Sequence, residues 1–218
     1  MRTIQRVVRR AEIEVEFSKG FNPHMALSIA QPLAVGVHSI GDYLDLVLTS
    51  SMNEEELIEK LNNNAPIGVK FLEAVAVPKI EGRKSLQSMA AIDAARYTIK
   101  IPVNKKSIGD SEIQELLKKD KWEINKIGKS GERIVDLKPQ IKEIKFWEKD
   151  EELIIKVLVS CGSKENLSPQ LLSEFIISNT SFAHKDKFID IKREEMYVYK
   201  DSEYLTLSEF FREDSTKK

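Results

Sequence analysis

Hydrophobic and polar positions along the first eighty residues follow a helical period first and a strand period afterwards. Apolar residues at helical spacing predict an amphipathic helix over residues 2–12; they are Ile4, Val7, Val8 and Ala11. Alternating and short apolar runs predict strands over 14–17, 26–30, 43–48 and 68–77. A second helix, over 51–64, is expected to begin at a capping box of Ser51 and Glu54. The expected order is helix, strand, strand, helix, strand.

The second half of the chain restarts the same kind of order. Strands are expected over 96–103, 122–127 and 189–199, and a hairpin is expected from 135–147 and 152–159 with its turn at 148–151. Helices are expected from Ser111 onward and from Ser168 onward, where Pro169 suits a first helical turn. In the last residues, 204–211 form a candidate short helix.

One strand placed before the first helix would complete a β-α-β-β-α-β unit, the ferredoxin-like arrangement. Because that strand would be central in its sheet, we expect that the chain begins too late, or that another chain or a rearranged sheet fills the place. The predicted fold class is therefore α+β, with two tandem ferredoxin-like units, the first lacking its N-terminal strand. The predicted division is a first unit over 1–80, a linker over 81–95, a second unit with an extra hairpin over 96–200, and a C-terminal tail over 201–218.

Composition indicates a globular, cytoplasmic protein. Hydrophobic residues make up 41% of the chain, enough for real cores, and no apolar run approaches the roughly 20 residues of a membrane span. No signal-peptide pattern follows Met1. A single cysteine, Cys161, excludes an internal disulfide and any cluster or zinc site built from the chain's own thiolates. We therefore predict no membrane partner, no metal and no cofactor of its own.

Charge is balanced overall but not locally. The net charge of −1 argues against indiscriminate nucleic-acid binding, and no DNA partner is predicted. The first ten residues nevertheless carry four arginines and no acid: Arg2, Arg6, Arg9 and Arg10. These side chains fall opposite the apolar face of the predicted helix, as a solvated surface or as an anion-binding one.

Between residues 18 and 36, glycine and proline interrupt strand-like runs. These residues set the backbone conformation of the segment at the expense of its strand propensity. Backbone N–H groups near Gly20 suit an anion nest, Phe21 suits either base stacking or a core position, and His24 suits a phosphate contact or a backbone hydrogen bond. The candidate binding residues are Arg6, Arg9, Arg10, Lys19, Gly20, Phe21, Asn22, Pro23, His24, Gln31, Pro32 and Gly36.

The motifs from Gly20 to His24, Ala30 to Leu33, Gly36 to Val37 and Gly41 to Leu46 resemble the radical SAM-linked protein family, a domain of unknown function found beside or fused to B12-binding-type radical SAM proteins. Looser matches follow at 135–139 and 191–197. The chain departs from the family pattern at Met25 and Ala26, where a lysine is lost, and at Lys138, where arginine is usual. The resemblance implies a radical SAM partner that carries the iron-sulfur cluster and S-adenosylmethionine, and it hints at RNA or ribosome work.

Two functions follow as hypotheses. The first is a non-catalytic accessory module that works with a radical SAM enzyme and binds RNA, such as a ribosomal or tRNA-type substrate. The alternative is a metal-independent ribonuclease or RNA-modifying enzyme that uses His24, by analogy with tandem ferredoxin-like endoribonucleases of CRISPR systems. We prefer the first. Asp42 and Asp45 alternate to opposite faces of a strand, and Cys161 is interpreted as a strand-end residue rather than a nucleophile.

Overall fold

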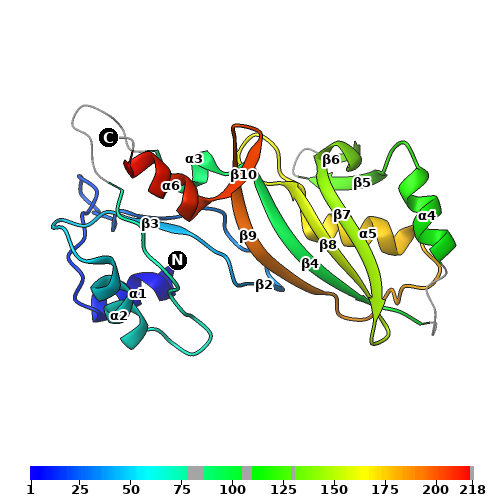
Figure 1. The fold of residues 1–218 in the computed structure, drawn as a ribbon. Helices are drawn as coiled ribbons and strands as arrows, with labels where there is room; N and C mark the ends of the chain where they lie inside the picture. Colours follow the sequence, from blue (N-terminus) through cyan, green and yellow to red (C-terminus); the bar gives the residue numbers. More distant parts are fainter. Residues whose placement is uncertain (78–85, 105–109, 129–130, 217–218) are drawn as a thin grey trace. The chain divides into compact units, whose positions relative to one another are not determined.

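A computed structural model describes residues 1–77, 86–104, 110–128 and 131–216, and it confirms the predicted α+β class (Figure 1). The chain forms two compact units. Unit 1 comprises Met1–Pro32, Tyr43–Ala91 and Lys200–Lys218, and unit 2 comprises Leu33–Asp42 and Ile92–Tyr199. This division differs from the predicted one, because residues 33–42 leave the first unit and the predicted tail belongs to it. The start of the predicted linker, 81–85, lies outside the described residues. The tandem ferredoxin-like arrangement stays a prediction.

Unit 1 is built around the apolar face of its first helix. Its elements are α1 (Arg2–Arg10), β1 (Leu27–Ile29), β3 (Leu44–Leu46), α2 (Glu54–Asn63), α3 (Ser88–Ala91), β10 (Glu203–Thr206) and α6 (Leu207–Thr216). β1 and β3 pair antiparallel, with Leu27 opposite Leu46. The buried cluster consists of Val7, Val8, Ala11, Ile13, Val15, Met25 and Leu61. The helical spacing read from the sequence is thus the spacing that buries this face.

Two of the strands expected in unit 1 are not formed as such. Residues 14–17 make only isolated bridges, from Val15 to Leu48 and from Phe17 to Met25. The predicted strand over 68–77 is wrong, because 69–77 contains no strand. The Asn62 side chain bonds both backbone groups of Phe71, at 2.8 and 2.9 Å, and so supplies hydrogen bonds that a neighbouring strand would otherwise give.

Helix α2 begins two residues later than the predicted capping box. Its N-cap is Asn53, whose side chain accepts hydrogen bonds from the backbone N–H groups of Glu55 and Glu56. An asparagine directly before the first helical residue satisfies these free donors itself, so Ser51 is not needed. The carboxylate of Glu54 is left to accept from the Ala76 N–H at 2.6 Å.

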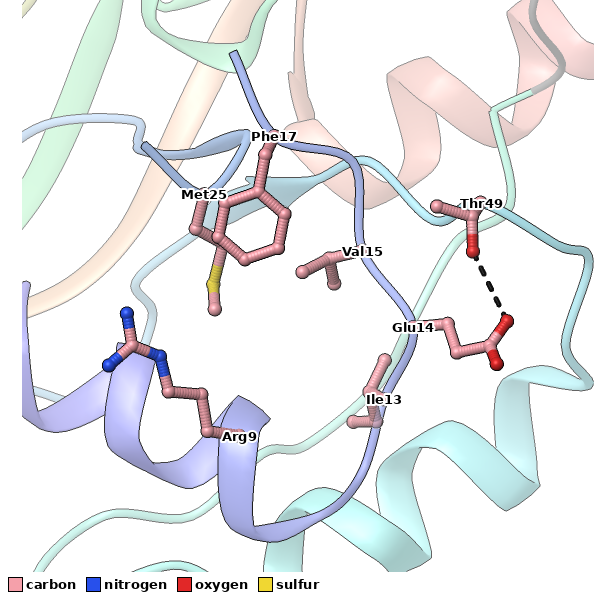
Figure 2. Close-up of a pocket in the computed structure, with 7 residues that line it drawn as sticks. All are labelled: Arg9, Ile13, Glu14, Val15, Phe17, Met25 and Thr49. Carbon is pink, nitrogen blue, oxygen red and sulfur yellow. Dashed lines mark hydrogen bonds between the residues drawn. The ribbon is translucent and has the colours of Figure 1, made fainter. Parts of the chain in front are cut away.

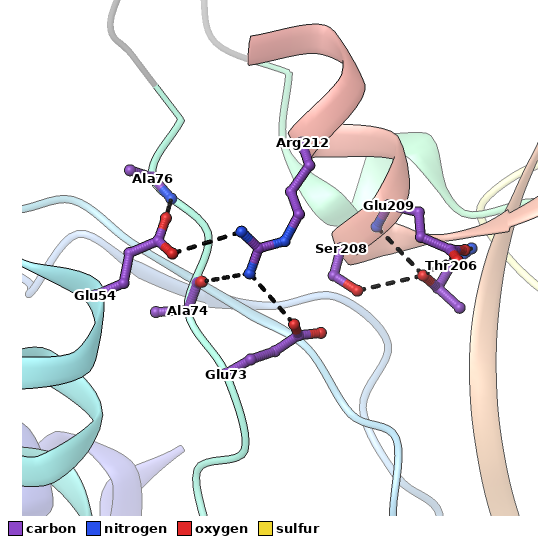
Figure 3. A network of polar contacts seen from close by, with 8 residues as sticks. All are labelled: Glu54, Glu73, Ala74, Ala76, Thr206, Ser208, Glu209 and Arg212. Carbon is purple, nitrogen blue, oxygen red and sulfur yellow. Dashed lines mark hydrogen bonds and ion pairs between the residues drawn. The ribbon is translucent and has the colours of Figure 1, made fainter. Parts of the chain in front are cut away.

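The C-terminal residues form β10 and α6 and join unit 1 (Figure 3). Thr206 and Glu209 make a reciprocal capping box, in which each backbone N–H donates to the other side chain, at 2.8 and 3.2 Å. The backbone N–H and the hydroxyl of Thr206 both donate to the Glu209 carboxylate and lower its pKa. From the next turn of the helix, Arg212 pairs with Glu54 at 3.6 Å and Glu73 at 3.4 Å, and it also donates to the carbonyl of Ala74.

Unit 2 is a mainly antiparallel sheet covered by a helix. Its elements are β2 (Val37–Ser39), β4 (Ala94–Pro102), α4 (Asp110–Lys118), β5 (Glu123–Gly128), β6 (Gly131–Asp136), a 3-10 turn (Lys138–Gln140), β7 (Ile141–Lys149), β8 (Glu152–Ser160), α5 (Pro169–Ser178) and β9 (Asp190–Lys200). The strands run in the order β9-β4-β8-β7, β2 pairs parallel with β9, and β5 pairs with β6 alone. The predicted hairpin is confirmed as β7 and β8, but its first strand begins at Ile141 and not at residue 135, because residues 135–136 belong to β6 and the 3-10 turn follows. The start of α5 after its N-cap Ser168 is also confirmed. Buried Phe175 of α5 stacks on Trp122, with ring centroids 5.1 Å apart.

The segment Leu33–Asp42 belongs to unit 2 because of a buried charge. Arg193 of β9 is 1% exposed, and its guanidinium donates to one carboxylate oxygen of Asp42 at 2.6 and 2.8 Å. The Ser39 hydroxyl donates to the same oxygen, and β2 pairs with β9 alongside. A Cβ at Gly41 would lie 2.2 Å from the Glu194 carbonyl oxygen, so only glycine permits this approach.

Replacing Asp42 with alanine is expected to lower the free energy of unfolding by about 2–3 kcal/mol, because it removes the carboxylate that partners a buried guanidinium. Asp42→Asn, which keeps an acceptor oxygen, should cost less. Urea unfolding followed by the fluorescence of buried Trp122 measures both. The matched control is Asp186→Ala at an exposed position of unit 2, expected within about 0.5 kcal/mol of the parent. Equal stabilities for Asp42→Ala and this control would contradict the assignment.

Candidate functional site

The exposed face of α1 carries free positive charge. Arg6, Arg9 and Arg10 are exposed, while Val7 and Val8 are buried on the other side of the helix. Within the part of the chain that the structure describes, these three arginines form no ion pair. Arg9 and Arg10 lie in the last turn, where the helix dipole favours cations. Their charge is therefore available to an anion from outside.

The candidate loop, residues 18–24, is closed at its base and exposed at its tip. The Ser18 N–H donates to the His24 carbonyl at 2.8 Å, and the His24 N–H donates to the Ser18 hydroxyl at 2.9 Å. Below them, Phe17 and Met25 form an antiparallel bridge. All residues from 18 to 24 are exposed, and the Phe21 side chain is fully so. The interpretation of Phe21 as a core residue is therefore wrong, and an aromatic ring faces solvent at the loop tip.

A hollow of about 450 Å³ joins the basic helix to the base of this loop (Figure 2). Its lining residues are Arg9, Ile13, Glu14, Val15, Phe17, Met25 and Thr49. Ile13, Val15 and Met25 are buried and form an apolar floor, whereas Phe17, which lies beside them, is 48% exposed. The Glu14 carboxylate accepts from the Thr49 hydroxyl at 3.3 Å, on the side of the hollow away from Arg9.

The hollow gathers one cation and one exposed aromatic ring around an apolar floor, with the Glu14 carboxylate on the side away from Arg9. An arginine can hold a phosphate, and a phenylalanine can stack on a base, so this combination suits an unpaired nucleotide. Sequence reasoning found Arg9 but missed Phe17, because alternation along 14–17 predicts a strand whose apolar side chains are buried. One sequence feature could have indicated its exposure: Phe17 lies directly before the loop of residues 18–24.

The other predicted site residues are distributed differently. Lys19, Gly20, Asn22, Pro23 and His24 lie with Phe21 in the exposed loop. Gln31 is half-buried and Pro32 exposed, both in unit 1 and outside the lining of the hollow, and Gly36 belongs to unit 2. Gly20 and Gly36 adopt φ of +131° and +85°, the backbone region that glycine favours.

No observation favours the hydrolytic alternative. His24 lies exposed, and its role as a catalytic residue stays a prediction. Asp45 accepts hydrogen bonds from Ser28, at 3.0 Å, and from the hydroxyl and N–H of Ser88, so it ties α3 to β1 and β3. Asp42 pairs with Arg193 in the other unit. Both carboxylates thus have structural partners of their own.

Three further features bear on chemistry and location: the lone cysteine, possible metal ligands and possible membrane-spanning helices. Cys161 is 1% exposed, and burial raises the pKa of its thiol to about 11. Across the described ranges, no three His, Cys, Asp or Glu side chains gather closely enough to hold a metal ion. No helix in the described part of the chain is long and apolar enough to cross a membrane.

The fold and the site together define a mixed α+β protein with a basic helix and an exposed aromatic loop. The chain belongs to the family described as "Uncharacterized protein conserved in bacteria (DUF2344)", whose model matches residues 1–169. A search of the curated proteins finds no match.

One solved structure is distantly similar in shape: a chain of the "Crystal Structure of a Cbf5-Nop10-Gar1 Complex", with 10% sequence identity and a TM-score of 0.48. The match covers 88% of the present chain and 44% of that chain, so the present chain spans less than half of its length. This likeness is too low to indicate a shared fold or function.

Cys161 is expected to resist thiol reagents in the native protein. At pH 8 an ordinary thiol, with a pKa of about 8.5, is roughly a quarter ionised. A thiol with a pKa of about 11 is ionised to only about one part in a thousand, and only the thiolate reacts. Labelling with a chromogenic disulfide reagent should therefore be slow until guanidinium unfolds the chain. Rapid labelling of the native protein would contradict the assignment of Cys161 as an inert buried residue.

Proposed function

We propose that this protein is a non-catalytic, cytoplasmic accessory module that binds RNA and presents it to a radical SAM enzyme. The observation that carries the RNA part is the hollow in unit 1, where Arg9 lies beside the exposed ring of Phe17 at the base of a loop that also exposes Phe21. Proteins that bind single-stranded RNA combine cations that follow the backbone with aromatic rings on which bases stack.

The distribution of charge supports the same proposal. Arg6 and Arg10 extend the positive surface of α1 beyond the hollow, without ion pairs within the described residues. The chain as a whole is close to neutral, so binding would depend on local surfaces of this kind rather than on the overall charge of the molecule. A ribosomal or tRNA-type RNA with an unpaired segment is the proposed ligand, because paired bases do not offer their faces for stacking.

The link to radical chemistry rests on the resemblance of the motifs over 20–46 to the radical SAM-linked family. In this proposal the partner supplies the iron-sulfur cluster and S-adenosylmethionine, and the present chain supplies substrate binding. The proposal includes the tandem ferredoxin-like arrangement. Its support in unit 2 is an antiparallel sheet whose strands are interrupted by α4 and α5, as a β-α-β-β-α-β order requires.

Removing two of the arginines should weaken RNA binding and its dependence on salt. In Arg6→Ala/Arg9→Ala, two phosphate contacts are lost. The slope of log affinity against log salt for a fluorescent oligouridylate should then fall by about 1.4, at about 0.7 for each contact to a single strand. Fluorescence anisotropy between about 50 and 200 mM salt measures both affinity and slope.

The matched control is Arg133→Ala/Lys185→Ala, which removes two exposed cations of unit 2 and should leave the slope unchanged. A third variant, Phe17→Ala, should lower affinity at all salt concentrations by about fivefold or more, because a stacked base contributes about 1–3 kcal/mol. If Arg6→Ala/Arg9→Ala binds with the affinity and slope of the parent, α1 is not the RNA surface and the proposal fails.

The partnership makes a separate prediction. Anaerobic affinity capture from host lysate, with half of the sample treated with ribonuclease before elution, should recover a radical SAM protein in both halves, recognised by its iron content and sequence. Recovery that depends on intact RNA would show that the two proteins meet only on a shared RNA. Recovery of no radical SAM protein in either half would contradict the partnership while leaving RNA binding open to the anisotropy test.

A further inference from the structure

A second surface with the chemistry of a nucleic-acid site lies on unit 2. Lys145, Trp147 and Lys149 lie on one face of the edge strand β7. Ile144 and Phe146 lie on the opposite face. Lys145 and Lys149 are exposed, and residue Trp147 is 42% exposed. We call Lys145, Trp147 and Lys149 the β7 patch.

The neighbouring strand β8 places a third lysine against the patch. Lys156 lies directly opposite Lys145, and Ile154 lies directly opposite Trp147. Like charges directly opposite one another on a sheet are destabilising. Lys156 is 3.3 Å from Glu194, whereas Lys145 forms no ion pair within the described residues. Glu194 therefore compensates Lys156, whereas a bound anion could compensate Lys145.

The rest of this sheet face is electrically compensated. Glu194 pairs with Lys156 and Lys192, and Asp190 pairs with Lys100 at 3.6 Å. A further pair, Arg96–Glu143, is at 3.0 Å. At the end of the hairpin Glu152 lies across from Lys149, and Asp150 and Glu151 form the turn directly beside it. Uncompensated positive charge is thus concentrated at Lys145, immediately beside the exposed indole.

We propose that the β7 patch is a second contact surface for single-stranded RNA, with a base stacked on Trp147 and phosphates held by Lys145 and Lys149. Side chains two residues apart on a strand are separated by about 6.6–6.8 Å, so one ammonium group lies on each side of the ring along the strand. A stacked base and its two flanking phosphates match this order of cation, ring and cation. The identity of the ligand rests on the proposed function; the place of this contact does not.

The two tryptophans allow a direct test in the full-length protein. Trp122 is 1% exposed, and its indole N–H donates to the Leu116 carbonyl, so its emission should not respond to ligand. Trp147 is exposed, and stacking of a base should quench it. Titration with oligouridylate should quench the parent protein. Trp147→Phe should keep its affinity and lose the quenching, which assigns the signal to residue 147.

Affinity variants test whether the contact contributes to binding. Trp147→Ala should weaken oligouridylate binding by about 5- to 150-fold, the equivalent of about 1–3 kcal/mol for a stacked base. Lys145→Glu should weaken oligouridylate binding relative to the parent, and the loss should be larger at low salt than at high salt. Arg133→Glu, the same charge reversal at an exposed position of β6, is the matched control and should bind like the parent. Unchanged Trp122 emission checks that each variant is folded.

The outcomes separate this inference from the proposed function. If Arg6→Ala/Arg9→Ala weakens binding but Trp147→Ala and Lys145→Glu bind like the parent without quenching, the β7 patch is overturned and the proposed function stands. If the β7 variants weaken binding and the α1 variants do not, the patch stands and the site in unit 1 is overturned. If the parent binds no RNA at all, both proposals fail.

Discussion

The buried guanidinium of Arg193 is the constraint on which the division of this chain depends. A charge at 1% exposure needs a charged partner, and Asp42 is that partner, at 2.6 Å. Because Asp42 lies far from β9 in the sequence, the pair draws residues 33–42 into unit 2 and interrupts the course of unit 1. The close approach at Gly41 and the parallel pairing of β2 with β9 follow from the same arrangement. A motif read as a connection between strands is therefore part of the second unit's sheet.

In unit 1 a single short helix serves both stability and the candidate site. Val7 and Val8 are buried because their spacing faces the core, and the same spacing turns Arg6 and Arg9 outward. The chain that follows α1 adds Ile13 and Val15 to the core and then leaves Phe17 half in solvent at the edge of the hollow. An apolar floor, a cation and an exposed ring thus arise within one stretch of seventeen residues, with Met25 as the long-range contribution. The patch on β7 repeats this chemistry on a sheet, where strand alternation rather than helical spacing separates Lys145 and Trp147 from the core.

Local patterns predicted the elements that depend on local physics. The helix over 2–12, the hairpin of β7 and β8, and the helix after Ser168 were all expected, because periodicity, turn residues and capping act between near neighbours. The expected strand over 68–77 failed for the opposite reason. Its apolar run suits a strand, but the Asn62 amide binds both backbone groups of Phe71, and no local pattern reveals a hydrogen bond of that kind. Phe17 was missed in the same way, since its exposure depends on what surrounds the strand rather than on alternation.

The sequence by itself determined the α+β class, the basic face of α1, the loop from Ser18 to His24 and most elements of the second half, although β6 was not predicted as a separate strand. These follow from side-chain period, charge and turn chemistry, which are carried by residues close together along the chain. Only the tertiary structure decided that Asp42 pairs with Arg193 and that Arg9 shares a hollow with Phe17 and Met25. Each of these joins segments whose separation in the sequence says nothing about their distance in space, because register and packing are chosen by the whole core and not by either partner.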